Sequence, residues 1–108
     1  MQISQVRYFL AVCEEQSFTH AARRCGVSQP SLTIAIRRLE QTVGGPLFHR
    51  YPRGVKLTEL GRVLNPYFKR LNRCISQAKC KADGFLAIKS AKSSRSKPRD
   101  RSMRALVP

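Results

Sequence analysis

Polar and basic side chains are concentrated near residue 29, where a helix is predicted to begin. In the stretch SQPSLTIAIRRLE, Gln29, Thr33 and Arg37 recur every four residues, so a helix places them on one face. Gln can bond an adenine edge, Thr offers a hydroxyl or a methyl group, and Arg reaches guanine or phosphate. Pro30 and Ile34 lie beside them and can contact a thymine methyl group. This face predicts a surface that reads a DNA groove, with Gln29, Pro30, Thr33 and Ile34 as base-reading residues.

A simpler interpretation fits the same residues, namely an ordinary solvated helix surface with a common N-cap. Ile34 argues against it, because this apolar side chain falls in the middle of the face expected to be exposed, among basic residues. A second group of residues has a weaker claim. These residues could contact phosphate, which fixes register and salt dependence rather than sequence choice. They are Ser28, Ser31, Arg37, Arg38, Arg50, Arg53 and Lys56.

Three helices are expected to position this face. The first is predicted over residues 3–15, because apolar residues recur at helical spacing at Ile3, Val6, Phe9, Leu10 and Cys13. Ser17 or Thr19 can cap a second helix, which Gly26 ends. Ser28 caps the third, and its core stripe is Leu32, Ile36, Leu39 and Val43. Two short helices joined through a glycine turn match the helix-turn-helix arrangement.

Two short apolar runs follow the third helix and predict a β-hairpin, or wing, with a basic tip at Pro52, Arg53 and Gly54. Thr58 can then cap a fourth helix, in which Pro66 predicts a kink or a lost hydrogen bond. Its apolar stripe has the 4-3-4-3-4 spacing of a two-stranded helical contact, which predicts a dimer interface. The stripe is Leu60, Leu64, Tyr67, Leu71, Cys74 and Ala78. The alternative is packing on the chain's own domain, at least for Leu60, Leu64 and Tyr67.

The predicted fold is therefore mainly α-helical. Residues 1–58 form a winged helix-turn-helix domain with three helices and a small hairpin, and residues 59–90 form a linker and dimerisation helix. Residues 91–108 are rich in Ser, Lys and Arg without an apolar period, which predicts a disordered basic tail.

Charge and composition narrow the function classes. The chain has 108 residues and a net charge of +15, unevenly divided. Residues 1–60 hold eight basic and four acidic side chains, and residues 61–108 hold thirteen and two. This balance favours a polyanionic partner, nucleic acid before an anionic membrane surface. No signal peptide or membrane span is evident, so a soluble cytoplasmic protein is expected.

Cysteine and histidine spacing predicts neither a metal site nor a cofactor. The four cysteines form no C-x-x-C pair, and the two histidines have no zinc-ligand spacing, so the cysteines are interpreted as small buried residues. The sequence also lacks a carboxylate pair, a nucleophile with its base and a phosphate-binding glycine loop. An enzyme is therefore not expected.

Five short motifs occur together in the first ninety residues: SFT-AA, VSQPSL, RRLE, PLFHR and LTE-G. In this combination the chain resembles the N-terminal domain of LysR-type transcriptional regulators. The resemblance implies a winged helix-turn-helix, dimerised through the linker helix and bound to double-stranded DNA with dyad symmetry. By position, it gives base-reading places to Gln29, Pro30, Thr33 and Ile34, and backbone contacts to Arg37, Arg50 and Arg53. Ile34 and Ala35 replace the polar or basic residues of many members, which suggests apolar contact with bases there.

The resemblance ends at about Lys92, and the family's effector-binding domain has no counterpart in the sequence. We expect a truncated or frameshifted regulator without a small-molecule effector site, which forms a homodimer or pairs with a full-length relative. The alternative is a nonspecific basic protein that binds nucleic acid or has an architectural role, in which the tail dominates.

Overall fold

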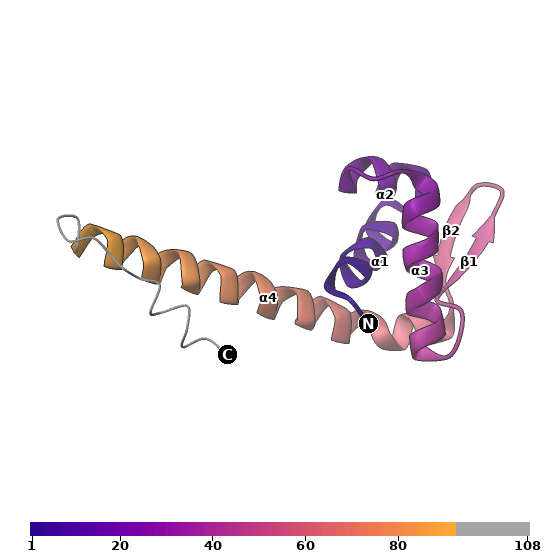
Figure 1. Ribbon diagram of the computed structural model, residues 1–108. Coiled ribbons are helices and arrows are strands. Elements are labelled where there is room, and N and C mark those ends of the chain that lie inside the picture. Colours follow the sequence, from indigo (N-terminus) through magenta and orange to yellow (C-terminus); the bar gives the residue numbers. More distant parts are fainter. Residues whose placement is uncertain (93–108) are drawn as a thin grey trace. The chain divides into compact units, whose positions relative to one another are not determined.

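The computed structural model describes residues 1–92, and the rest of the predicted tail lies outside the described residues. It contains three helices, a hairpin and a long fourth helix (Figure 1). In chain order these are α1 (Ile3–Glu15), α2 (Phe18–Cys25), α3 (Gln29–Val43), β1 (Phe48–Tyr51), β2 (Gly54–Leu57) and α4 (Glu59–Lys92). The predicted winged helix-turn-helix with a following long helix is confirmed. Residues 91 and 92 are helical, so the prediction of disorder from residue 91 began too early.

The described chain divides into two units, Met1–Cys74 and the part from Ile75 onward. The predicted domain boundary after residue 58 coincides with the start of α4 and stays a prediction.

Local signals explain where the helices begin and end. The Ser17 hydroxyl accepts a hydrogen bond from the His20 amide at 3.1 Å and caps α2. Gly26 then ends α2 with φ at 73°, a left-handed conformation that glycine adopts without steric cost. Ser28 caps α3, and Pro30 lies in its first turn, where a missing N–H costs nothing. These caps fix the turn between α2 and α3.

An aromatic cluster joins α1, α2, the wing and α4 in the core of the first unit. The Phe9 ring lies 5.2 Å from that of Phe48 and 5.1 Å from that of Phe68. Phe48 in turn meets Phe18 edge-on at 5.7 Å. Around the cluster lie buried aliphatic side chains, which include Val6, Val12, Leu32, Ile36, Leu39 and Leu47. Ile3 is the exception to the predicted α1 stripe, because half of it is exposed at the start of the helix.

The wing is a two-stranded antiparallel sheet in which Phe48 pairs with Leu57 and Tyr51 with Gly54. Pro52 and Arg53 form its tip, as predicted. Phe48 is buried, which anchors the base of the hairpin.

The first turn of α4 is bonded to the chain that leads into the wing. The Thr58 hydroxyl donates to the Pro46 carbonyl at 2.7 Å and accepts from the Gly61 amide at 2.9 Å, so it caps the helix as predicted. A Cβ on Gly61 would lie only 2.4 Å from the Leu47 carbonyl oxygen. This helix start therefore requires glycine at position 61. Helical structure continues through Pro66 to Lys92.

The side chains of α4 that face its own domain differ from the predicted set. Leu60 and Leu64 pack against the core, as the alternative interpretation held. The third position is Phe68, which is 5% exposed, whereas Tyr67 is 58% exposed. Assigning Tyr67 to the domain was therefore wrong, because the helix turns Phe68 toward Phe9.

The cysteines are less buried than expected. Cys13 and Cys25 are partly buried, whereas Cys74 and Cys80 on α4 are exposed. The interpretation as small buried residues was wrong for these two, because neither lies on a face of α4 that packs against the core.

Candidate nucleic-acid interface

Short hydrogen bonds order the first turn of α3. The Ser28 hydroxyl accepts from the Ser31 amide at 3.2 Å and donates to the Ser31 hydroxyl at 3.0 Å. Both residues are exposed. Their positions are therefore set by the helix cap and not by burial, which leaves their outer edges open to a ligand.

The outward face of α3 presents the residues that the sequence singled out for base contact. Gln29, Pro30 and Ile34 are exposed, and Thr33 is half-buried. Ile34 exposes 52% of its surface, although the opposite face of the same helix carries the buried Leu32 and Ile36. Burial of that opposite face fixes the rotation of α3, which explains how an apolar side chain is held in solvent.

Basic residues extend this face along α3 and onto the wing. All five basic residues that were predicted to contact phosphate are exposed. They are Arg37 and Arg38 on α3, and Arg50, Arg53 and Lys56 on the hairpin. Of these, Arg50 has a defined position, because its guanidinium carbon lies 3.9 Å from the centre of the Phe18 ring. No sequence pattern predicts this stacking, since Phe18 and Arg50 are far apart along the chain.

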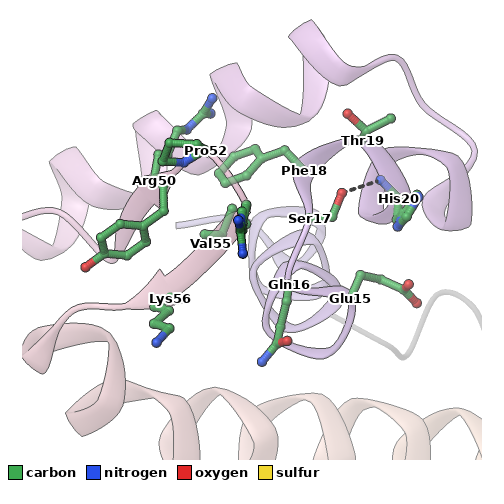
Figure 2. A pocket seen from close by; sticks show the side chains of 13 residues that line it. Glu15, Gln16, Ser17, Phe18, Thr19, His20, Arg50, Pro52, Val55 and Lys56 are labelled. Carbon is green, nitrogen blue, oxygen red and sulfur yellow. Dashed lines mark hydrogen bonds between the residues drawn. The ribbon is translucent and has the colours of Figure 1, made fainter.

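A pocket separates the start of α2 from the wing. Figure 2 shows its lining, in which residues 15–20 run from the end of α1 into the start of α2 and the others come from the hairpin. The dashed bond in Figure 2 is the cap from the His20 amide to Ser17. Arg50, Arg53 and Lys56 supply three positive charges to this lining. Its chemistry suits an anion.

Thr19, in the same lining, links the two helices of the motif. Its hydroxyl donates a hydrogen bond to Gln29 Oε1 at 3.1 Å, across ten residues of chain. Sequence reasoning treated Thr19 only as a possible cap, a role that Ser17 takes instead. A contact between two exposed side chains on different helices leaves no periodic signal in the sequence.

Three carboxylates of the first unit already have partners. Arg24 forms ion pairs with Glu14 at 2.6 Å and Glu15 at 3.2 Å, and these carboxylates raise the pKa of Arg24. Glu40 accepts a hydrogen bond from the Leu47 amide at 2.7 Å. Paired carboxylates repel a polyanion less than free ones do, so the surface stays favourable for nucleic acid.

Within residues 1–92, no group of three or more His, Cys, Asp or Glu side chains could hold a metal ion.

The partly buried Cys13 contacts α4, because Asn65 Nδ2 donates a hydrogen bond to its sulfur at 3.4 Å. Burial raises the pKa of the Cys13 thiol to about 11, and the Asn65 bond opposes that shift. No helix in the described part of the chain is both long and apolar enough to span a membrane.

The predicted dimer stripe divides into two parts. Leu60 and Leu64 are engaged with the domain core, whereas Tyr67, Leu71, Cys74 and Ala78 are exposed. Phe85, Leu86 and Ile88 are also more than half exposed. The structure describes a single chain, so a role for these residues in dimerisation stays a prediction.

Sequence comparisons identify relatives with this domain. The family model described as the bacterial regulatory helix-turn-helix protein of the lysR family matches residues 3–62. The HTH-type transcriptional regulator BudR of Klebsiella aerogenes is 54% identical over 61 residues, which are 56% of this chain and 43% of that protein. The regulator TfdT of Cupriavidus pinatubonensis is 49% identical over 63 residues, 58% of this chain and 28% of that protein. The chain thus spans less than half the length of these curated relatives.

Solved structures show the same arrangement. A complex of the BenM DNA-binding domain with the catB site 1 DNA is similar with a TM-score of 0.75 and 36% identity, over 80% of this chain and 97% of that chain. Full-length CbnR with its target DNA is similar with a TM-score of 0.71 and 31% identity, over 77% of this chain and 29% of that chain. The family model covers more than half of the sequence and the fold agrees with it. The chain therefore belongs to the LysR family of bacterial helix-turn-helix regulators.

Proposed function

We propose that this chain is a sequence-specific DNA-binding transcriptional regulator. The observation that carries the proposal is the outward face of α3, where Gln29, Pro30, Thr33 and Ile34 are exposed or half-buried at the start of the second helix of a helix-turn-helix. That end of the helix is the one that contacts base edges in this motif. The similarity to two regulators solved with DNA supports the same function.

The proposed residue roles follow the chemistry of the side chains. Gln29, Pro30, Thr33 and Ile34 contact base edges in the major groove, the first and third by hydrogen bonds and the other two by apolar contact. Phosphate contacts position the domain on the duplex. They come from Ser28, Ser31, Arg37, Arg38, Arg50, Arg53 and Lys56.

We also propose that the chain forms a homodimer through α4, or pairs there with a longer relative. The supporting feature is the exposed part of the stripe, Tyr67, Leu71, Cys74 and Ala78, because apolar side chains exposed along one helix are typical of protein contacts. Leu60 and Leu64 contribute less, since they already pack on the core. Sedimentation over a concentration series would test this, and a strict monomer at high concentration would contradict it.

A second candidate function is nonspecific binding of nucleic acid through charge. Its support is the thirteen basic and two acidic residues after position 60. Both candidates are binding functions without catalysis or a cofactor, and both place the protein in the cytoplasm with bacterial DNA. They differ in whether α3 chooses the sequence.

Selection of bound sequences from random duplex DNA separates the two candidates. We expect a motif with dyad symmetry, and Gln29→Ala to weaken binding to it by about 1–3 kcal/mol, with little effect on random DNA. Gln41→Ala is the matched control, because Gln41 is an exposed glutamine at the opposite end of α3. Equal losses for Gln29→Ala on selected and random DNA would rule out the sequence-specific function.

A further inference from the structure

The two helices of the motif are joined by one side-chain bond at the point where DNA is proposed to bind. Thr19 is the second residue of α2 and Gln29 the first of α3, and the Thr19 hydroxyl donates to Gln29 Oε1 at 3.1 Å. Both side chains are exposed. Because both partners are exposed, the bond adds little to the stability of the fold.

Helix capping does not explain Thr19. The cap of α2 is Ser17, which accepts from the His20 amide, and the cap of α3 is Ser28, which accepts from the Ser31 amide. Both helices therefore have a side-chain cap without the Thr19 hydroxyl. The hydrogen-bond partner of Thr19 is Gln29, which is proposed to contact bases, so we assign Thr19 a role in base recognition.

The bond engages the oxygen end of the Gln29 amide. A glutamine side chain has one carbonyl acceptor and an NH2 group with two donors. A bidentate contact with adenine needs both ends, because Oε1 accepts from N6 while Nε2 donates to N7. With Oε1 held by Thr19 on the α2 side, the NH2 group keeps both of its donors for DNA. Guanine presents two acceptors in the major groove, N7 and O6, which match two donors.

We propose that Thr19 is a positioning residue that orients the Gln29 amide so that its NH2 group reads the N7 and O6 acceptors of guanine. The proposal rests on the proposed function, since it assumes that Gln29 faces a base. It adds a residue on α2 to the determinants of sequence choice and commits Gln29 to guanine over adenine.

Three variants of the full chain test the proposal. Thr19→Val removes the hydroxyl and keeps the side-chain volume, Thr19→Ser keeps the hydroxyl, and Thr19→Ala removes it without β-branching. Thr42→Val is the matched control, because Thr42 is an exposed threonine on α3 whose hydroxyl bonds the Arg38 carbonyl of its own helix. Urea denaturation checks that each variant folds.

The readout is base preference at the position that Gln29→Ala relaxes. The wild type should prefer guanine there, and 7-deazaguanine at that position should weaken its binding. Thr19→Val and Thr19→Ala should lower the guanine-to-adenine preference by about tenfold, the size of one lost base contact. Thr19→Ser should restore the preference, and affinity for random DNA should stay within about twofold in all variants.

Several results would overturn the inference. One is a wild-type preference for adenine, thymine or cytosine at the position that Gln29→Ala relaxes. Another is equal loss by Thr19→Val on selected and random DNA, which would make Thr19 a phosphate contact. An enriched motif whose guanine preference survives Thr19→Val would overturn the inference and leave the proposed function intact. Failure to enrich any motif would instead reject the proposed function, and the inference with it.

Discussion

The outward face of α3 and the exposed part of α4 after Phe68 are both basic and both carry apolar residues, but they are ordered differently. At the start of α3 exposed side chains are bonded in two pairs, Ser28 with Ser31 and Thr19 of α2 with Gln29. On α4 the side chains are long. Interactions there include a Lys79 to Asp83 ion pair at 4.0 Å, Arg70 at 5.2 Å from the Tyr67 ring and Lys89 at 6.0 Å from the Phe85 ring.

Because of this difference, the two surfaces suit two kinds of partner. Bonded side chains lose little conformational freedom on binding, so they can discriminate between similar ligands. Long side chains adapt and cover area, which suits a partner recognised by apolar contact and charge. We therefore expect substitutions on α3 to change sequence choice, and substitutions on exposed α4 to change association.

The largest expected effect is a loss of stability at Phe68, where α4 packs on the domain core. Phe68→Ala should destabilise the fold by about 3–5 kcal/mol, because it removes a buried ring that packs on Phe9. Tyr67→Ala, its neighbour, should change stability by less than about 0.5 kcal/mol, since its side chain is exposed. Urea denaturation measures both. Similar losses for the two variants would show that α4 packs in another rotation.

A smaller effect should separate the two surfaces. Ile34→Ala removes apolar contact with DNA and should weaken binding to the selected sequence by about 1–2 kcal/mol, without changing the oligomeric state. Leu71→Ala should raise the dissociation constant of the dimer and leave binding to a half-site unchanged. Fluorescence anisotropy and sedimentation give the two readouts. If Ile34→Ala changed association, or Leu71→Ala changed half-site binding, the division of tasks would be wrong.

The smallest effect is a difference in thiol reactivity that leaves stability unchanged. The exposed Cys74 and Cys80 should react with a thiol reagent at pH 8, whereas Cys13 should react only as the pH approaches its raised pKa of about 11. If α4 dimerises as proposed, a higher protein concentration should slow the reaction of Cys74 more than that of Cys80. Mass spectrometry of the labelled peptides distinguishes the sites. Fast labelling of Cys13 at pH 8 would contradict its environment.

Most of the fold could be predicted from local signals in the sequence. Ser17, Gly26 and Ser28 act within a few residues of their own positions, so cap chemistry predicts the helix-turn-helix, and helical spacing predicts its exposed face. The rotation of α4 depends instead on a distant ring, Phe9, and apolar spacing alone selected Tyr67 over Phe68. Spacing describes a helix in isolation, whereas tertiary contact decides which of two adjacent aromatic residues is buried.

The candidate site was predictable in its residue types and less so in its contacts. Gln29 and Ile34 follow from helical spacing, and both are exposed as expected. The stacking of Arg50 on Phe18 and the bond from Thr19 to Gln29 join residues of different elements. Such contacts depend on how the elements pack, which a periodic pattern does not encode.

The approach of the Gly61 main chain to the Leu47 carbonyl has a further consequence. A Cβ there would come within 2.4 Å of that oxygen, so a hydrogen atom in place of a side chain sets how near α4 lies to the entry of β1. The hairpin that carries Arg50 and the helix that carries Phe68 meet at this seam. Within the unit Met1–Cys74, the wing proposed to contact DNA and the first turns of α4 are therefore held to each other at one glycine.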